Sequence, residues 1–264
     1  MLSPIARRRE GPARPVIGVL CCNESLDRPV QSVASRFIEP LSRISGATVL
    51  LVPALADVMD TAALVDRLDG LLLTGSRSHV APWHYGGQRV PDAPGDEQRD
   101  LVALTLAGRM IDQGRPVFGI CRGLHELNVL FGGTLIDVDD AGHHRDDADL
   151  SFADLFDNRH DVHLTPGGVL EQVSGASRMS VNSVHRQGVG RLGGGLTVEA
   201  VSAHDDLVEA FSAHPCGGEV LAVQWHPEWG GAKEPAERAF FERIGFALRG
   251  NIEACRTPTV SGTV

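Results

Sequence analysis

The residue of this chain best suited to covalent chemistry is Cys121, which lies at a predicted change of direction. The four uncharged residues 117–120 before it are typical of a buried strand, whereas Leu124, Leu127 and Phe131 follow at helical spacing. A strand-to-helix corner pushes its side chain out of the sheet beside the next backbone N–H, and a helix N-terminus favours a negatively charged thiolate. The corner predicts a nucleophile, although a small buried cysteine after a strand would give the same local pattern.

The second chemical stretch, from Gln224 to Trp229, contains a histidine and a glutamate two residues apart. Alternate residues of an extended segment point to the same side, so His226 and Glu228 can share a face, and Pro227 stiffens their relation. In such a pair the carboxylate fixes the imidazole tautomer, and the imidazole takes and returns the proton of a nucleophile. An exposed His-Pro-Glu turn is the alternative interpretation, because short motifs are common.

The composition limits the kind of protein that carries these residues. A chain of 264 residues can form one large α/β domain or two smaller ones with a substantial core. With 24 basic and 34 acidic residues, the net charge of −10 argues against a nucleic-acid binder and is weakly compatible with a cationic small molecule. No run approaches the roughly 18 apolar residues of a membrane helix. The prediction is a soluble protein without a membrane or nucleic-acid partner.

The cysteines and the termini indicate where the protein works. The cysteines are odd in number and include no C-x-x-C pair, so neither a disulfide framework nor a cysteine zinc site is indicated, and the cytoplasm is the expected location. The five are Cys21, Cys22, Cys121, Cys216 and Cys255. Residues 1–14 lack the apolar run of a signal peptide and are predicted to be a flexible leader. Residues 15–250 are predicted to form a single domain, and residues 251–264 a tail.

Alternating apolar runs and helical patterns in the first half predict a parallel sheet covered by helices on both faces. Strands are expected at residues 15–22, 48–53, 70–74 and 117–120, and helices at 31–45 (kinked or split at Pro40), 57–68 (capped by Asp57) and 96–114. Residues 76–96 are expected to be a long functional loop. Because ligands bind beyond the carboxyl ends of parallel strands, Gly75 and Cys121 should lie at the same mouth.

The second half is predicted to add short strands and a closing helix. Residues 134–138, 161–165 and 180–187 are expected to be short pieces rich in His, Asp and Gly. Residues 220–225 are expected to be the last strand, residues 196–203 and 207–213 an antiparallel hairpin, and residues 235–249 a closing helix. Residues 139–149 are predicted to be an acidic loop, and the chain from Thr257 is predicted to be disordered. The expected fold class is α/β, with an open, mostly parallel sheet flanked by helices and a small antiparallel β extension.

Several ordered motifs together resemble a known family, the class I glutamine amidotransferase-like hydrolases of the peptidase C26 type. The motifs are residues 119–123 with Asn128 and 132–135, then 182–188, 198–200, 207–210 and 223–229. Within the family the likeness is greatest to the γ-glutamyl-γ-aminobutyrate hydrolases of putrescine breakdown and their γ-glutamylpolyamine hydrolase relatives. The resemblance runs from about residue 15 to residue 247.

The resemblance implies a flavodoxin-like open sheet and a Cys-His-Glu triad formed by Cys121, His226 and Glu228. It also implies an oxyanion hole made of two backbone N–H groups, which correspond here to Gly75 and Arg122. The family uses no cofactor, and no metal ligand is expected. Donors of the oxyanion-hole kind typically contribute about 3 kcal/mol each to transition-state binding.

The resemblance further implies that Ser76, Ser183 and His185 bind the glutamyl amino and carboxylate groups. The sequence departs from the family at His125, where the family usually has glutamine, and this imidazole could carry charge. His79 likewise stands where relatives often have asparagine.

Trp83, followed by His84 and Tyr85, is expected to form an apolar or cation-binding wall beside the nucleophile. Residues 139–149 would draw cationic amines to the mouth if they lie near it.

Four functions fit these observations. The leading prediction is hydrolysis of a small-molecule γ-glutamyl amide of γ-aminobutyrate or of a polyamine. The reaction would pass through a thioester on Cys121, with water as the second substrate. The sequence does not decide whether the protein is a monomer or a homodimer. The second is a glutaminase subunit that delivers ammonia to a synthase partner. The third is a metal-dependent hydrolase or metal-binding module, in which the ligands would come from His143, His144, His160 and His163. The fourth, a binding protein without catalysis, is disfavoured by the intact triad.

Overall fold

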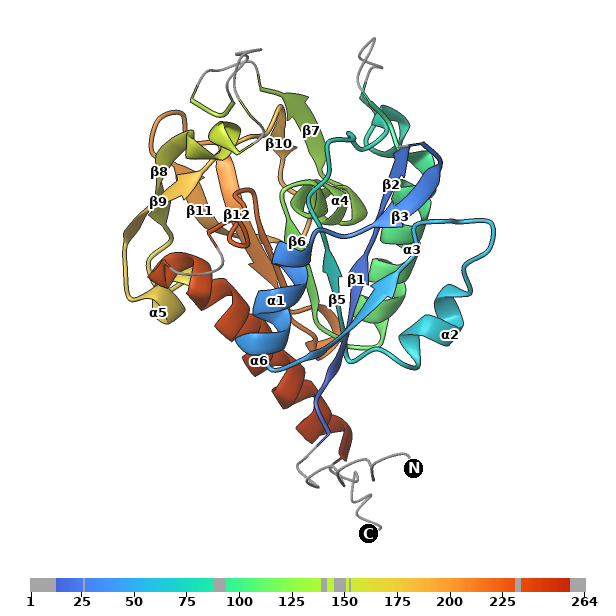
Figure 1. The fold of residues 1–264 in the computed structure, drawn as a ribbon. Coiled ribbons are helices and arrows are strands. Elements are labelled where there is room, and N and C mark those ends of the chain that lie inside the picture. Colours follow the sequence, from blue (N-terminus) through green and yellow to red (C-terminus); the bar gives the residue numbers. More distant parts are fainter. Residues whose placement is uncertain are drawn as a thin grey trace, which may run out of the picture.

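The computed structural model describes residues 13–25, 27–87, 94–138, 142–144, 151, 153–230 and 234–256, which form an open α/β sheet flanked by helices (Figure 1). The nine strands of the sheet lie in the order β4 (Thr48–Val52), β1 (Val16–Leu20), β5 (Gly70–Leu73), β6 (Val117–Ile120), β13 (Val220–Val223), β12 (Val208–Ala213), β11 (Thr197–Ser202), β8 (Arg159–Leu164) and β9 (Arg178–Asn182). The strands from β4 to β13 run parallel, and the remaining four continue the sheet antiparallel. The predicted fold class is confirmed.

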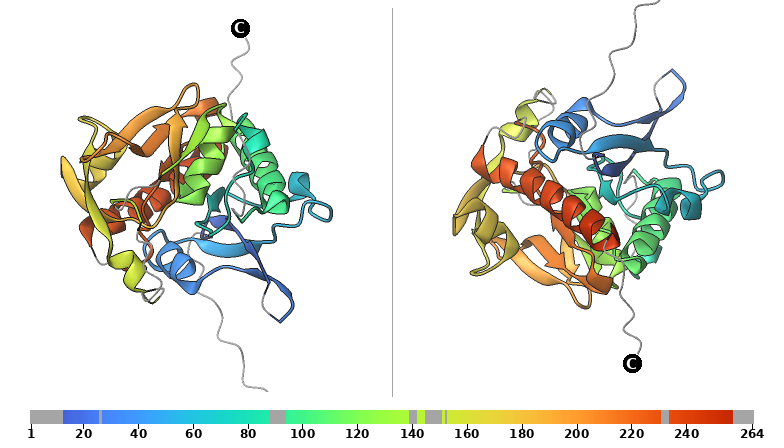
Figure 2. Two further views of the ribbon diagram at one scale, coloured as in Figure 1. Left: turned by 90° about the horizontal axis from the view of Figure 1, so that it is seen from above. Right: turned by 90° about the horizontal axis from the view of Figure 1, so that it is seen from below.

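Both faces of the inner parallel strands β1, β5, β6 and β13 are buried, because alternate side chains enter two apolar layers. Leu72 and Phe118 enter one layer, where they meet α1 (Ser35–Arg43), α5 (Val169–Ser174) and α6 (Pro235–Arg256). Leu71 and Leu73 enter the other layer with α3 (Glu97–Asp112) and α4 (Arg122–Leu130), while α2 (Thr61–Val65) packs beside them. Figure 2 shows α1 and α6 on the opposite side of the sheet from α3 and α4. This burial explains the continuous apolar strand sequences.

Two small antiparallel sheets flank the main one: β2 (Cys22–Ser25) with β3 (Pro29–Ser32), and β7 (Thr134–Asp137) with β10 (Gln187–Arg191). The helix predicted from residue 31 begins only at Ser35, because Gln31 belongs to β3 and its side-chain oxygen accepts the Ala54 N–H at 2.7 Å. Pro40 does not split α1, since the helix runs without interruption from Ser35 to Arg43 with Pro40 inside it.

Three further boundaries differ from those predicted. The cap of α2 is Asp60 rather than Asp57, with its carboxylate accepting the Ala63 N–H at 3.0 Å. The short piece expected at residues 180–187 spans parts of two strands, since β9 ends at Asn182 and β10 begins at Gln187. Helix α6 runs to Arg256 rather than to residue 249. The predicted disordered tail from residue 257 lies outside the described residues, as does most of the acidic loop at 139–149.

The remaining predicted elements agree with the structure. β11 and β12 pair antiparallel as a hairpin, and the loop after β5 contains two short pieces, η1 (Pro82–His84) and a bridge between His79 and Gly95. Short 3-10 turns also occur at η2 (Asp154–Asp157) and η3 (Pro215–Gly217). Among the described residues, no helix is both long enough and apolar enough to cross a membrane.

Candidate active site

Cys121 makes the turn between β6 and α4 by itself, as the sequence predicted. Its φ of 51° and ψ of −104° are a conformation that L-residues rarely adopt. The N–H of Cys121 donates to the Val223 carbonyl of β13 at 2.8 Å, and the Cys121 carbonyl accepts the Leu124 N–H at 2.9 Å. The strand on one side and the helix on the other therefore hold the strained turn in place, with the thiol at the edge of a cavity.

Glycines allow three chain segments to meet around Cys121. A Cβ atom on Gly119 would lie 2.6 Å from the carbonyl carbon of Gly123, so β6 and α4 approach closely only without a side chain at residue 119. A Cβ atom on Gly75 would lie 2.6 Å from Cε1 of His226 and 3.6 Å from Cβ of Cys121. The backbone that follows β5 thus lies directly against the thiol and the imidazole.

His226 and Glu228 are hydrogen-bonded, as their spacing predicted. Nδ1 of His226 lies 2.7 Å from Oε1 of Glu228, and the Glu228 side chain is fully buried. The chain around His226 is held by Asn182 at the end of β9. The Asn182 amide accepts the His226 N–H at 2.8 Å and donates to the His226 carbonyl at 2.9 Å. Sequence reasoning missed this anchor, because residues 182 and 226 are brought together only by the tertiary fold.

The charge state of His226 depends on both of its neighbours. Burial alone would lower the pKa of His226, but the charges of Glu228 and of the Cys121 thiolate, together with hydrogen bonds to both, raise it to about 10. At neutral pH the imidazole of His226 is therefore protonated beside the Cys121 sulfur. A cysteine paired with an imidazolium is an activated nucleophile.

A buried network of two arginines and two carboxylates fixes the loop after β5 to the nucleophile helix. Arg122 pairs with Asp100 at 2.7 Å and also with Glu126, which in turn accepts Nε of Arg99 at 3.0 Å. Arg122 further donates to two loop carbonyls, those of Ser78 at 2.9 Å and His79 at 3.2 Å. The spacing of Arg122 and Glu126 by four residues was the one signal for this network in the sequence.

The cavity beside Cys121 has a volume of about 570 Å³. Of the predicted site residues, Cys121, His226, Gly75, Ser76, His125 and His185 line it. Apolar lining comes from Val33, Phe37, Leu155 and Phe156, and charged lining comes from Glu24, Arg36, Arg77 and Arg186. The ring of Phe156 packs edge-on against the His226 ring, with 5.1 Å between centroids. The cavity thus brings the candidate nucleophile and base together with apolar side chains, three arginines and one glutamate.

His125, which replaces the expected glutamine, is buried and neutral. Its Nε2 lies 2.8 Å from Oε1 of Gln224, and burial lowers the pKa of His125 to about 3 although this hydrogen bond opposes the shift. With the Gln224 oxygen as acceptor, Nε2 carries the proton and Nδ1 remains an acceptor. The suggestion that this imidazole carries charge is therefore not supported.

Other predicted binding residues lie apart from the cavity or have partners already. Trp83 is 58% exposed and does not line the cavity, so the structure does not bring it to the predicted wall beside Cys121. Ser183 is buried outside the lining and donates to the His143 carbonyl at 2.8 Å. His185 lines the cavity, but its Nδ1 lies 3.0 Å from the Gln187 carbonyl. The Ser76 hydroxyl lies 3.1 Å from that of Ser78.

Comparisons with known proteins identify relatives along most of the chain. The sequence model of the family described as peptidase C26 matches residues 15–228. The γ-glutamyl-γ-aminobutyrate hydrolase of Escherichia coli O157:H7 is 35% identical over 250 residues, which cover 92% of this chain and 94% of that protein. A Mycobacterium tuberculosis protein, named provisionally as a glutamine amidotransferase, is 32% identical over 83% of this chain and 71% of its own length.

A solved structure shares the fold at low sequence identity. It is a Thermoplasma acidophilum protein assigned provisionally as one of the subunits of GMP synthase, with a TM-score of 0.63 and 20% identity over 93% of this chain and 100% of that one. At this identity the likeness concerns the fold alone. It agrees with the mostly parallel sheet described above.

Proposed function

Because the chain belongs to the peptidase C26 family and is a cysteine-dependent hydrolase, we propose that it hydrolyses a γ-glutamyl amide to glutamate and a free amine. The observation that carries this proposal is the meeting of Cys121, on its strained turn, with a protonated His226 that Glu228 holds by a 2.7 Å hydrogen bond. The named activity of the Escherichia coli relative supports the γ-glutamyl head of the substrate.

In the first half of the proposed reaction, Sγ of Cys121 attacks the γ-carbonyl carbon and forms a tetrahedral oxyanion. The N–H groups of Gly75 and Arg122 would donate to this oxyanion. The Arg122 N–H lies in the first turn of α4, where N–H groups have no acceptor within the helix. His226 then gives its proton to the leaving nitrogen, the C–N bond breaks, and a glutamyl-thioester remains on Cys121.

In the second half, water replaces the amine. Neutral His226 takes a proton from the water molecule, whose oxygen attacks the thioester carbonyl, and the C–S bond breaks to release glutamate and the thiolate. Glu228 stabilises the imidazolium in both halves without accepting a proton itself. The cycle consumes one water molecule and needs no other reactant, so we assign no cofactor to it.

The lining of the cavity favours a leaving group that carries a carboxylate. Arg36, Arg77 and Arg186 line the cavity together with one carboxylate, that of Glu24. A conjugate of γ-glutamate with an amino acid such as γ-aminobutyrate presents two carboxylates to these groups, whereas a polyamine conjugate presents further cations. We therefore propose γ-glutamyl-γ-aminobutyrate or a similar conjugate as the substrate, in preference to a γ-glutamylpolyamine. We also propose a cytoplasmic location, which the free thiols of the four described cysteines fit.

Glutamate release from a panel of γ-glutamyl amides tests this proposal. We expect kcat/KM to be highest for γ-glutamyl-γ-aminobutyrate, lower for the putrescine and spermidine conjugates and lowest for glutamine, whose leaving group forgoes remote binding energy. Glutamine cleaved as fast as the conjugates would instead favour a glutaminase subunit, the function suggested by the name of the Mycobacterium tuberculosis relative. Equal rates with the polyamine conjugates would contradict the role assigned to the arginines.

A further inference from the structure

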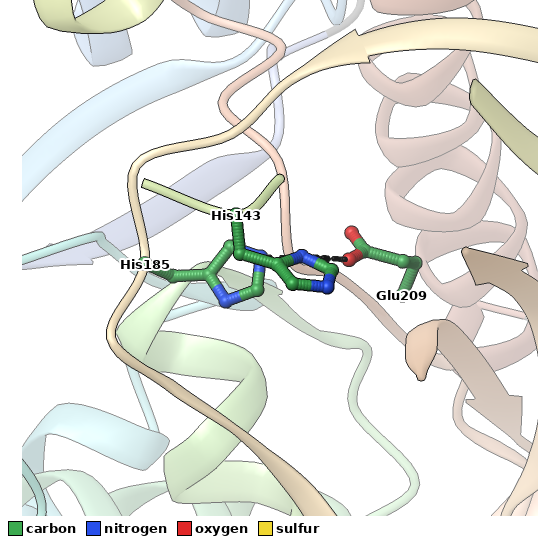
Figure 3. Close-up of side chains that lie close together, drawn as sticks. All are labelled: His143, His185 and Glu209. Carbon is green, nitrogen blue, oxygen red and sulfur yellow. Dashed lines mark ion pairs between the residues drawn. The ribbon is translucent and has the colours of Figure 1, made fainter. Parts of the chain in front are cut away.

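Three histidines surround one glutamate outside the proposed triad. His143 belongs to the segment 142–144, His160 to β8, His185 to the connection between β9 and β10, and Glu209 to β12. Figure 3 shows the rings of His143 and His185 beside the Glu209 carboxylate. One oxygen, Oε1 of Glu209, lies 3.3 Å from Nε2 of His160, 3.4 Å from Nε2 of His185 and 3.6 Å from Nδ1 of His143.

These inner atoms are buried without hydrogen bonds. The inner nitrogen of each histidine and both oxygens of Glu209 lack a hydrogen-bond partner among the described residues. Glu209 is fully buried, and His143 and His185 are 1% and 3% exposed. Buried polar atoms in native proteins almost always have a partner, so a whole group of unpartnered atoms around one point indicates an occupant.

The outer ring nitrogens determine which way the inner ones face. Each outer nitrogen already has an acceptor: Asp205 Oδ2 at 2.9 Å for His143, the Gln187 carbonyl at 3.0 Å for His185 and the Gly142 carbonyl at 3.3 Å for His160. In a neutral imidazole the proton then sits on the outer nitrogen, and the inner nitrogen presents a lone pair. Three lone pairs thus converge on a carboxylate, an arrangement that a cation between them would stabilise. Acceptors on the outer nitrogens are also typical of metal-binding histidines.

The distances fit a metal ion better than shared protons. Charge-assisted N–H···O bonds are usually about 2.7–2.9 Å long, and the His226–Glu228 pair of this molecule has such a bond at 2.7 Å. The contacts of Glu209 are 3.3–3.6 Å. Around a tetrahedral Zn²⁺ with bonds of about 2.0–2.1 Å, neighbouring ligand atoms lie about 3.3–3.4 Å apart. The ligand atoms of His143, His185 and Glu209 all lie within 4.8 Å of one another, and Nε2 of His160 adjoins them through its 3.3 Å contact with Glu209.

We propose that His143, His160, His185 and Glu209 bind one Zn²⁺ ion. Three imidazoles and one carboxylate are ligands that suit Zn²⁺, and four protein ligands in a buried site leave no open position for substrate. The ion has a structural role: it joins β8 and β12 to the segments that carry His143 and His185. Because His185 lines the cavity, the ion also holds one side of the cavity in place.

Metal content and thermal unfolding of the full chain test this proposal. We expect about one zinc per chain in freshly purified protein, by elemental mass spectrometry. After dialysis against a chelator, ZnCl₂ at about 100 times its Kd should raise Tm by roughly 5–10 °C. Co²⁺ in place of zinc should give the visible absorption bands of a tetrahedral site. The proposal would be overturned if the protein contained no zinc, if zinc did not raise Tm and if Co²⁺ gave no such bands. The inner atoms would then share protons instead of a metal ion.

Variants locate the ion. Glu209→Gln removes the charge but keeps the shape of the side chain, and His143→Ala removes a ligand from a segment outside the main sheet, so each should fold while zinc binding falls at least about tenfold. The matched control is His163→Ala, an exposed histidine of β8 three residues from His160, which should bind zinc as the wild type does. Equal loss of zinc in the control, or full zinc binding in both ligand variants, would contradict the assignment.

Discussion

The molecule contains two buried groups that combine histidine with glutamate. They differ in whether the imidazole nitrogens are hydrogen-bonded to the carboxylate. His226 and Glu228 share one proton at 2.7 Å, beside the Cys121 thiol. Around Glu209, three imidazoles stand 3.3–3.6 Å from the same oxygen and form no hydrogen bond with it. One group is arranged to move a proton, and the other is arranged to hold a cation.

The difference shows that residue type does not by itself set the chemistry of a histidine. At His226 a single carboxylate and the Cys121 sulfur stabilise the imidazolium, which suits an acid and base. At Glu209 the outer nitrogens are bonded to carbonyls and to Asp205, so the inner ones are left to bind an ion. The predictions that follow ask whether the two groups can be separated experimentally.

The largest effect is expected at the nucleophile. Cys121→Ala removes the atom that forms the thioester, so kcat should fall by about 10⁴-fold or more while zinc binding and Tm remain close to wild type. The exposed Cys216 provides the matched control, since Cys216→Ala should retain activity. Measurable turnover by folded Cys121→Ala protein, free of wild-type contamination, would remove the covalent mechanism.

A smaller but still severe effect is expected at the base. His226→Asn leaves no group to protonate the leaving amine or to activate water, and kcat should fall by about 10³- to 10⁴-fold. Iodoacetamide should also react more slowly with Cys121 in this variant, because the thiolate loses its imidazolium partner. If the Glu209→Gln variant lost as much activity as His226→Asn at a temperature well below its Tm, the separation of the two groups would be wrong.

Loss of the orienting carboxylate, Glu228, is expected to lower kcat less than loss of the base and to change the pH dependence of activity. Glu228→Gln keeps a hydrogen-bonding group in place, so kcat should fall by about 10²-fold. In the wild type the proton needed by the leaving amine is present below the raised pKa of His226 and is lost as pH rises through about 10. Glu228 is one cause of that elevation, so its loss should move the alkaline limit to lower pH. An unchanged alkaline limit in Glu228→Gln would show that Glu228 does not set the pKa.

The smallest effect on catalysis is expected from metal removal. A chelator should lower Tm without changing kcat in assays well below the unfolding transition, because no proposed step passes through the ion. Iodoacetamide, by contrast, should inactivate at Cys121 before any other cysteine. If chelation lowered kcat and added zinc restored it, the two groups would belong to one catalytic site, and a metal-dependent hydrolase would be favoured.

Much of the fold could be predicted from local patterns. Continuous apolar runs indicated the parallel strands, and the corner at Cys121 and the pair of His226 and Glu228 were visible because each depends on adjacent residues. The early helix boundary was wrong because the side chain of Gln31 accepts the N–H of the distant residue Ala54, a contact that periodicity cannot reveal.

The side-chain contacts around Glu209 and along the cavity could not be predicted. Histidine counting pointed to His143, His144, His160 and His163, but the fold gathers His143 and His160 with His185 and Glu209 instead. His163 alternates outward on β8, where its side chain is exposed. Trp83 was expected in the cavity from its loop, yet Phe156, 35 positions after Cys121 in the chain, packs on the His226 ring. Only the tertiary arrangement determines such contacts.

Trapping the acyl-enzyme tests the central claim most directly. Wild-type protein and His226→Asn are mixed with γ-glutamyl-γ-aminobutyrate, quenched in acid, and examined by intact mass and peptide mapping. We expect one glutamyl group per chain on the peptide that contains Cys121, with more of it in His226→Asn, and none in Cys121→Ala. Amine release without a glutamyl adduct in either protein, or an adduct on another residue, would contradict Cys121 as the nucleophile.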